Sequence, residues 1–379
     1  MIKNKTRKIN ILLLILVLLT ISIMIKPVVW AISSEESTSA KGMVVYEGVS
    51  DTVLYENNSN DRLPMASTTK IATAIVAIEN CNDIKTPFVI SSKAVGVEGT
   101  SIYLKDGEKI CMYDLLLGLM LASGNDCAIA IAEYFGYDNF MNLMQELVLK
   151  LELSNTHFDN PHGLDSDTHY TSAYDLAVIT DYALDNELFR EVCSTERAII
   201  PKTNVSEERY LKHKNKLLFS MENCIGVKTG FTDNAGRCLV NAHEENGMRV
   251  ISVVLNCGPM FEECEILTNK ALSEYVLKEF ISPYSYVTDI NVVGGEKNKI
   301  SVVTINEFTK AIKQDDLERY SVKYDVPDVL EAPVELNSVV GKVYVYYDDE
   351  IIFESNLIAI DETRNIDIKY ILNEILEKW

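Results

Sequence analysis

The chain has 379 residues, of which 47% are hydrophobic and 24% are charged, and its formal net charge is −21. This composition is typical of a globular protein and excludes a disordered or fibrous chain, while the length allows one large domain and a smaller second one. Because so acidic a chain is repelled by polyanions, we expect no nucleic-acid partner.

The first 31 residues have the pattern of an export signal. Four basic residues within the first eight precede an apolar run from Ile11 to Ile25, which Val29-Trp30-Ala31 follows. The pattern predicts a signal peptide cleaved after Ala31, with an uncleaved N-terminal anchor as the alternative, because the run is long for the first and short for the second. In either case we expect the rest of the chain to be exported.

The eight cysteines are scattered over 81–264 and show no Cys-x-x-Cys or Cys/His spacing typical of a metal site. We interpret them as small buried hydrophobic residues and expect no metal site. A bond between Cys224 and Cys238 across a predicted hairpin is the alternative.

Apolar periodicity changes along the chain from strands to helices and back to strands. Alternation of period two predicts strands at 43–46, 52–55, 225–231, 237–242 and 249–256. Spacing of three and four predicts helices over 66–80, 113–121, 128–135, 140–151, 172–184 and 261–280. Asn246-Gly247 is a strong hairpin signal between the last two strands. This order predicts an α+β fold with helices packed on an antiparallel sheet.

The region 283–379 has a different character and is predicted to be a small β-rich domain. Short alternating stretches predict strands at 291–293, 299–305, 320–324, 341–347 and 351–355, with no catalytic cluster among them. Apolar residues at helical spacing over 368–379 predict a terminal amphipathic helix. We expect this helix to face a core, with contact to a membrane surface as the alternative.

Three short motifs follow one another in the part of the chain before residue 283. They are Ser67-Thr68-Thr69-Lys70, Ser123-Gly124-Asn125 and Lys228-Thr229-Gly230. A Ser-x-x-Lys or a Ser-x-Asn is expected by chance about once in a chain of this length, so neither is informative alone. The functional signal is the set of three in this order.

The motifs supply a nucleophile, a base and a carboxylate clamp. Ser67 needs an adjacent base, and Lys70, one helical turn away, is that base if burial or a nearby cation such as Lys228 lowers its pKa. Ser123 is predicted to relay a proton, and Asn125 to bind a substrate amide or hold Lys70.

The third motif is the predicted carboxylate site. Lys228 and Thr229 suit a substrate carboxylate, and Gly230 is expected to let a ligand approach the strand closely. Each motif alone also fits a structural role: a helix cap, a turn between helices, or an exposed strand lysine.

With these motifs in their longer segments, the chain resembles the serine-type D-alanyl-D-alanine carboxypeptidases, the low-molecular-mass penicillin-binding proteins. The segments that carry the resemblance are 65–70, 121–126, 160–165, 169–171 and 226–232. The likeness spans about 40–282, and the region after it resembles that family's C-terminal domain. We therefore expect a catalytic domain over 32–282 and a β-rich domain over 283–379.

The resemblance implies that Ser67 attacks the carbonyl between the last two D-alanines of a peptidoglycan stem peptide. Lys70 would take its proton, Ser123 would deliver one to the departing D-alanine, and the backbone N–H groups of Ser67 and Phe231 would form the oxyanion hole. It implies penicillin and other β-lactams as inhibitors that acylate Ser67. It further implies no cofactor, and a location at the outer face of the cell membrane or in the wall.

Three alternatives remain open at this stage. A class A β-lactamase shares the motifs and adds a glutamate, for which Glu152-Leu153-Ser154-Asn155 is only a loose match. A DD-endopeptidase would use the same residues, and an inactive wall-binding homologue would keep the fold.

Some family members place an arginine after the last core strand, where this chain has Met260 to Cys264. His162 and His169 are interpreted as structural, because Lys70 makes a catalytic histidine unnecessary.

Overall fold

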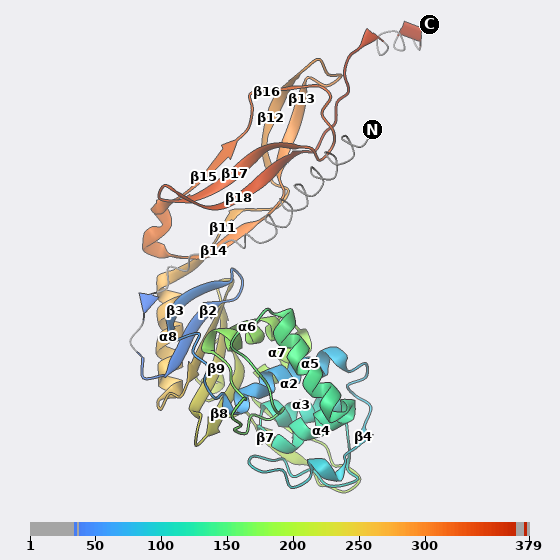
Figure 1. Cartoon of the computed structure of the whole chain (residues 1–379), viewed down its shortest axis with the longest axis vertical. Helices are drawn as coiled ribbons and strands as arrows, with labels where there is room; N and C mark the ends of the chain where they lie inside the picture. The colour runs from blue at the N-terminus through green and yellow to red at the C-terminus, as the bar shows by residue number, and fades with distance from the viewer. Residues whose placement is uncertain (1–33, 36–37, 369–374, 377–379) are drawn as a thin grey trace, which may run out of the picture. The chain divides into compact units, whose positions relative to one another are not determined.

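The structure is a computed structural model that describes residues 34–35, 38–368 and 375–376 (Figure 1). The predicted signal segment and most of the predicted terminal helix lie outside these residues. Ile368, Ile375 and Leu376 from that helix are described and exposed, so the expectation of a core-facing helix is wrong at these three residues. No helix among the described residues is long and apolar enough to cross a membrane.

A six-stranded sheet is the centre of the first region, with strand order β1-β3-β2-β10-β9-β8. Its strands are β1 (Ser34–Glu35), β2 (Gly42–Glu47), β3 (Thr52–Asn57), β8 (Cys224–Thr232), β9 (Gly236–Glu245) and β10 (Met248–Leu255). The sheet is antiparallel except that β1 pairs parallel to β3. Asn246 and Gly247 both have positive φ in the turn between β9 and β10, so the predicted hairpin is confirmed.

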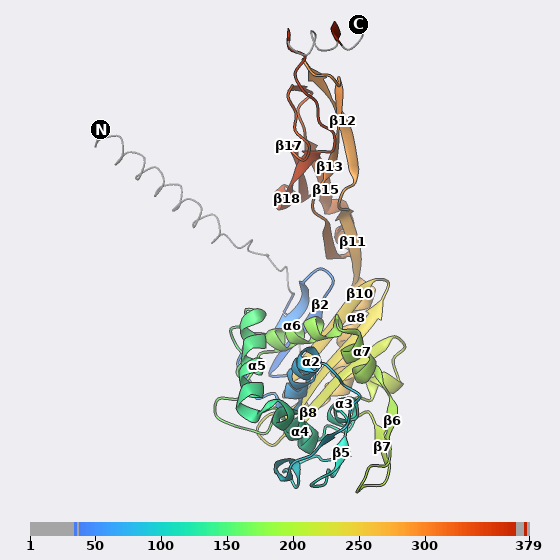
Figure 2. The same cartoon turned by 90° about the vertical axis from the view of Figure 1, so that its right-hand side faces the viewer.

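Seven α-helices of the described chain belong to this region. They are α2 (Lys70–Asn80), α3 (Met112–Met120), α4 (Asn125–Phe135), α5 (Tyr137–Lys150), α6 (Ala173–Leu184), α7 (Glu187–Ser194) and α8 (Met260–Glu274). Helix α2 contacts α3, α5, α6 and α7 and is the central one (Figure 2). The short 3₁₀-helix η1 (Ala66–Thr69) leads directly into it.

The sheet is covered on both faces, which places the site inside a layered fold. Successive residues of β2 point to opposite sides: Val44 and Tyr46 pack with the α2–α7 helices, and Met43 and Val45 pack with α8 (Figure 1). Because both faces are buried, β2 is buried at every position. The predicted α+β fold, helices on an antiparallel sheet, is confirmed.

Smaller elements border the helical layer, several of which the sequence pattern did not indicate. They are the pairs β4 (Phe88–Val89) with β5 (Lys109–Ile110) and β6 (Arg197–Ile200) with β7 (Arg209–Lys212), and the 3₁₀-helices η2 (Ser92–Ala94) and η3 (Leu217–Phe219).

The predicted helix over 261–280 is wrong in its last third. Helix α8 ends at Glu274, and the chain continues as β11 (Tyr275–Ile281), which pairs with β14 (Phe308–Lys313). Pairing with a strand some thirty residues later overrides a local pattern that favours helix, as tertiary context often does.

The last region is β-rich, as predicted. A six-stranded sheet has the order β15-β17-β18-β13-β12-β16. These strands are β12 (Tyr286–Val293), β13 (Lys299–Thr304), β15 (Tyr320–Asp325), β16 (Val329–Glu331), β17 (Val339–Tyr347) and β18 (Glu350–Ala359), with η4 (Gln314–Arg319) before β15. Ile290, Val302, Val343, Val345 and Leu357 form its core.

All eight cysteines are free, and six of them are buried, so they act as small core residues. The alternative of a Cys224–Cys238 bond is excluded by strand register. Cys224 lies opposite His243, whereas Cys238 lies opposite Gly230, six residues further along β8.

Candidate active site

Ser67 and Lys70 meet at the junction of η1 and α2. Ser67 lies in the 3₁₀ turn and is partly exposed, and Lys70, the first residue of α2, is fully buried. The Lys70 Nζ lies 2.9 Å from the Ser67 Oγ. The three-residue spacing therefore brings the two side chains together over one turn, with the hydroxyl accessible to a substrate.

Two further acceptors fix the orientation of the Lys70 amine. Nζ donates to the Asn125 Oδ1 at 2.7 Å and to the backbone oxygen of His162 at 2.6 Å. Both are oxygens that only accept, and the Asn125 amide orientation is set because its Nδ2 donates to the Glu98 oxygen at 2.7 Å. A neutral amine has two N–H groups, so these acceptors use both and leave the lone pair directed at the Ser67 hydroxyl.

The environment of Lys70 favours that neutral form. The pKa of Lys70 is lowered from 10.5 to about 7, mainly by burial and in addition by the positive charge of Lys214, whereas Cys127 and Asp126 oppose the shift. A base with a pKa near the working pH combines availability with proton affinity. The expected role of Lys228 as the neighbouring cation is taken by Lys214.

Ser123 lies in the turn between α3 and α4 and contacts the third motif. Its Oγ accepts a hydrogen bond of 2.9 Å from the Lys228 Nζ, which also donates to the Thr229 oxygen at 2.9 Å. Ser123 is almost fully buried and has a φ of 64°, a conformation that non-glycine residues adopt when the surrounding structure holds them.

Lys228 is fully buried on β8, and burial, together with Lys70 and Lys214, lowers its pKa well below the usual range. An arriving carboxylate would reverse part of this shift, because an opposite charge favours the ammonium form. This chemistry suits a site that binds an anion where three lysines lie close together.

The turn that holds Ser123 and Asn125 is fastened by a buried carboxylate. Asp126 accepts from the backbone N–H of Ile102 and Leu104 and from the Ser101 hydroxyl. The same loop is held from the other side by Arg209, which donates to the Ile102 oxygen at 2.8 Å.

Arg209 in turn forms a buried ion pair. Its guanidinium lies 2.8 Å from the Glu108 carboxylate, which is fully buried and also accepts from Thr203 and Ser206. Two charged side chains, Asp126 and Arg209, therefore hold the loop that contains Ile102 in place beside the second motif.

Gly230 lies where η1 comes close to β8. A side chain there would lie 3.0 Å from the Met65 oxygen and 3.1 Å from the Ser67 nitrogen, so the glycine lets the start of η1 approach β8. Thr229 is half-buried on the same strand, and Phe231 follows with an exposed ring. The register thus brings the backbone at Gly230 and Phe231 to the nucleophile.

The loop 160–170 reaches the site through its backbone rather than through its histidines. His162 contributes its carbonyl to Lys70, and burial lowers the pKa of its ring to about 3. The His169 Nδ1 accepts from the Asp159 N–H, so its Nε2 carries the proton and donates to Thr69. Gly163, with a φ of 88°, allows the contact, because a Cβ would lie 1.9 Å from the Ala66 oxygen. The structural interpretation of both rings agrees with these contacts.

Sequence reasoning missed Lys214, which follows β7 and lies between the second and third motifs. Its Nζ is 3.4 Å from the Thr100 Oγ1, and partial desolvation lowers its pKa, although the residue is still exposed to solvent. It belongs to no short motif, so only the packing of this loop against Thr100 reveals it. Within the described residues, no group of three or more metal-ligating side chains is arranged around a common point.

Comparison with known families identifies the chain. A family model described as D-alanyl-D-alanine carboxypeptidase matches residues 30–258, and one described as penicillin-binding protein 5, C-terminal domain, matches 275–364. The chain belongs to the family of D-alanyl-D-alanine carboxypeptidases, the low-molecular-mass penicillin-binding proteins, and the resemblance noted from its motifs is confirmed.

Curated relatives match over most of their length. The chain is 29% identical over 359 residues to D-alanyl-D-alanine carboxypeptidase DacF of Bacillus subtilis, covering 92% of each chain. It is 30% identical over 343 residues to D-alanyl-D-alanine carboxypeptidase DacC of Escherichia coli, covering 86% of this chain and 84% of the other.

Solved structures show the same fold. Penicillin-binding protein 5 of Haemophilus influenzae is 25% identical, with a TM-score of 0.73 over 88% of this chain and 99% of the other. A mutant of the Streptomyces K15 DD-transpeptidase is 30% identical, with a TM-score of 0.60 over 63% of this chain and 99% of the other.

Proposed function

We propose that the protein is a serine-type D-alanyl-D-alanine carboxypeptidase that removes the terminal D-alanine from peptidoglycan stem peptides through an acyl-enzyme on Ser67. The observation that carries the proposal is the Lys70 amine, which lies 2.9 Å from the Ser67 Oγ while two carbonyl acceptors engage its N–H groups. Membership of the family supports the substrate class.

In acylation, the Lys70 lone pair accepts the Ser67 proton as the Oγ attacks the carbonyl between the two D-alanines. Negative charge then develops on the carbonyl oxygen, and the N–H groups of Ser67 and Phe231 are proposed to stabilise it. Ser123 delivers a proton to the departing nitrogen and is reprotonated by the Lys70 ammonium, which thereby returns to its neutral form. Asn125 orients Lys70 and the substrate amide. Lys228 and Thr229 hold the carboxylate of the departing D-alanine. Water then hydrolyses the ester to release the shortened peptide and regenerate the Ser67 hydroxyl.

Penicillin is proposed to acylate Ser67 by the same route, because its strained amide presents a carbonyl and a carboxylate in a similar arrangement. The alternative of a class A β-lactamase is disfavoured. Glu152, the glutamate of the loosely matching segment, is exposed just after α5. Lys70 is hydrogen-bonded to the His162 carbonyl and not to a carboxylate of the loop at 160–170.

We also propose the division into an export signal over 1–31, a catalytic domain over 32–282 and a β-rich domain over 283–379. The family-model matches at 30–258 and 275–364 support a two-domain mature chain, in which β11 pairs with β14 from the second region. The protein is proposed to act outside the cytoplasm, at the membrane surface or in the wall, where its substrate lies.

Mass spectrometry tests the function directly. The protein would be incubated separately with penicillin and with a peptide that ends in D-Ala-D-Ala. We expect a long-lived adduct on Ser67 with penicillin and free D-alanine from the peptide, and neither in Ser67→Ala. Rapid turnover of penicillin without release of D-alanine would instead identify a β-lactamase. Retained hydrolysis in Ser67→Ala would refute the assignment of the nucleophile.

A further inference from the structure

Four cationic side chains form a row on the surface beside the active site. Lys212, Lys214 and Lys216 alternate with buried residues where the chain leaves β7, and all three are exposed. Arg197 of β6 is exposed too and lies opposite Lys212 in the register of the β6–β7 pair. Opposite residues of an antiparallel pair project from the same face, so Arg197 extends the row sideways. We call these four residues the cationic row.

The row is fixed in place next to the first half of β8. Asn215, between two of its lysines, is buried, and its Nδ2 donates to the Gly226 oxygen at 2.7 Å. Lys214 reaches the active site itself: its Nζ is 3.4 Å from the Thr100 Oγ1, and its charge lowers the pKa of Lys228. The row therefore runs past the place where the departing carboxylate is proposed to bind.

The charge of the row is not neutralised. Among the residues that the structure describes, no carboxylate forms an ion pair with any of the four side chains. Three of them lie over aromatic rings instead. The Arg197 Cζ and the Lys212 Nζ are 6.0 and 4.9 Å from the centre of the Phe219 ring, and the Lys216 Nζ is 5.4 Å from that of Phe261. A neutral ring orients a cation without cancelling its charge, so the row is held ready for an anion.

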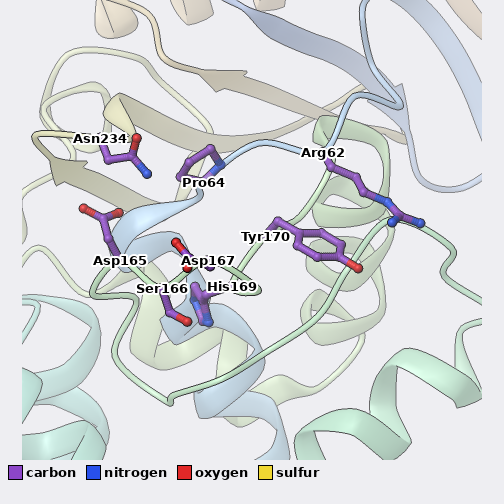
Figure 3. Close-up of a pocket in the computed structure, with 8 residues that line it drawn as sticks. All are labelled: Arg62, Pro64, Asp165, Ser166, Asp167, His169, Tyr170 and Asn234. Carbon is purple, nitrogen blue, oxygen red and sulfur yellow. The ribbon is translucent and has the colours of Figure 1, made fainter.

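The surroundings of the row are acidic. The chain has 56 acidic and 35 basic residues, and in the same hairpin Lys202 pairs with Glu207 at 2.7 Å. At the other end of β8, an open cavity of about 460 Å³ has Asp165 and Asp167 in its wall (Figure 3). Both are exposed. The charge around the active site is therefore asymmetric, with carboxylates at the end of β8 and unpaired cations beside its beginning.

The substrate of the proposed reaction is itself an anionic polymer. Every stem peptide ends in a carboxylate, both before and after the terminal D-alanine is removed, so a strand with many stem peptides carries many negative charges. A protein with a net charge of −21 is repelled by such a strand unless it offers a local positive surface. The mechanism uses one substrate carboxylate, at Lys228 and Thr229, and the neighbouring stem peptides supply further ones.

We propose that the cationic row binds carboxylates of neighbouring stem peptides on the same peptidoglycan strand, so that the enzyme favours polymeric over monomeric substrate. Arg197, Lys212 and Lys216 attract these carboxylates while one stem peptide occupies the active site. Each contact is weak, but once the first has formed, the others are made within one complex and their effects combine. This inference rests on the proposed function and specifies the form of its substrate.

Two substrates that differ only in their linkage provide the test. Release of D-alanine by the full chain would be measured from uncross-linked peptidoglycan strands with intact pentapeptides, and from the disaccharide pentapeptides that a muramidase releases from the same strands. The measured quantity is the ratio of kcat/KM, per stem peptide, for polymer and monomer. At low salt, the double variant Lys212→Gln, Lys216→Gln should lower this ratio about 2- to 10-fold, as for two exposed ion pairs. High salt should bring the wild-type ratio close to that of the variant.

The matched control is the double variant Lys85→Gln, Lys323→Gln. Both lysines are exposed, each lies over a tyrosine ring, and neither belongs to the row. This variant removes the same two charges and should keep the wild-type ratio. Adding Arg197→Gln to the row variant should lower the ratio further, whereas Lys214 is left intact because its charge acts on Lys70. Because each ratio is measured within one variant, a general change in activity or folding cancels.

Either of two results would overturn the inference while leaving the carboxypeptidase assignment intact: a wild-type ratio in the row variant at low salt, or an equal fall of the ratio in the control variant. An equal loss of activity on polymer and monomer counts as the first result, because it leaves the ratio unchanged. Failure of the wild type to release D-alanine from either substrate would overturn the assignment itself, and this inference with it.

Discussion

Replacing Lys214 with glutamine should move the pH dependence of Ser67 acylation to higher pH. Lys70 acts as a base only when neutral, and its pKa is lowered from 10.5 to about 7 by burial, with a contribution from the Lys214 charge. At pH 7 the amine is then neutral in about half of the molecules, instead of about one in 3000 at a pKa of 10.5. The burial of Lys70 is thus worth roughly three orders of magnitude in available base.

The direction of the pH effect follows from the positive charge of the protonated form of Lys70, its ammonium. Below the pKa of Lys70, the acylation rate should rise about tenfold per pH unit, and above it the rate should level off. Removing the Lys214 cation raises the pKa of Lys70, because one unfavourable interaction with its ammonium form disappears. The acylation rate at pH 6 to 7 should therefore fall, and the rate should reach its plateau at a higher pH than in the wild type.

The assay is the second-order rate constant for penicillin acylation of Ser67, measured by stopped-flow or by mass spectrometry between pH 5 and 10. We expect a half-maximal rate near pH 7 in the wild type and a higher midpoint in Lys214→Gln. Lys212→Gln, an exposed lysine two residues earlier, removes the same charge and should keep the wild-type midpoint. A wild-type midpoint near 10, or identical midpoints in the wild type and Lys214→Gln, would refute the argument that Lys70 is a base tuned by its surroundings.

Two further substitutions test the support around Lys70. Asn125→Asp places a carboxylate 2.7 Å from the Lys70 Nζ, which should favour the ammonium form and raise the acylation midpoint; a lower midpoint would contradict this. Arg209→Met leaves the fully buried Glu108 carboxylate unpaired and should cost about 3–5 kcal/mol in the free energy of unfolding by urea. The double variant Arg209→Met, Glu108→Gln should recover part of that loss. If the single and the double variant were equally unstable, the unpaired Glu108 carboxylate would be excluded as the cause of the instability.

Much of the catalytic domain could be predicted because its signals are local. The periodicity that predicts α2 and the Asn246-Gly247 turn each depend only on residues close together in the sequence, and the structure contains both elements. The strand over 275–281 was missed for the opposite reason. Its conformation depends on β14, and no pattern within the segment itself identifies that partner.

The residues of the site likewise fall into those that a short motif predicts and those that it does not. Spacing alone places Ser67 one turn from Lys70, and this pair is found at hydrogen-bond distance. The contributions of the His162 carbonyl and of Lys214 follow no motif, because a backbone oxygen carries no residue signature and a lysine is common on any surface. The close approach of Gly230 to the Met65 oxygen and the Ser67 nitrogen likewise follows no motif, since these atoms belong to a segment far from β8 in the sequence.

The sequence by itself determined the reactive groups, their order and the family, because short motifs encode which atoms are present and how far apart they lie along one element. The tertiary structure decided what those atoms can do. Only the tertiary structure brings Asn125 of α4 and the loop at 160–170 onto Lys70, where burial lowers its pKa. The same two acceptors, the Asn125 Oδ1 and the His162 carbonyl, direct its lone pair to Ser67. Desolvation and hydrogen-bond direction arise between segments distant in the chain, so a linear pattern does not record them.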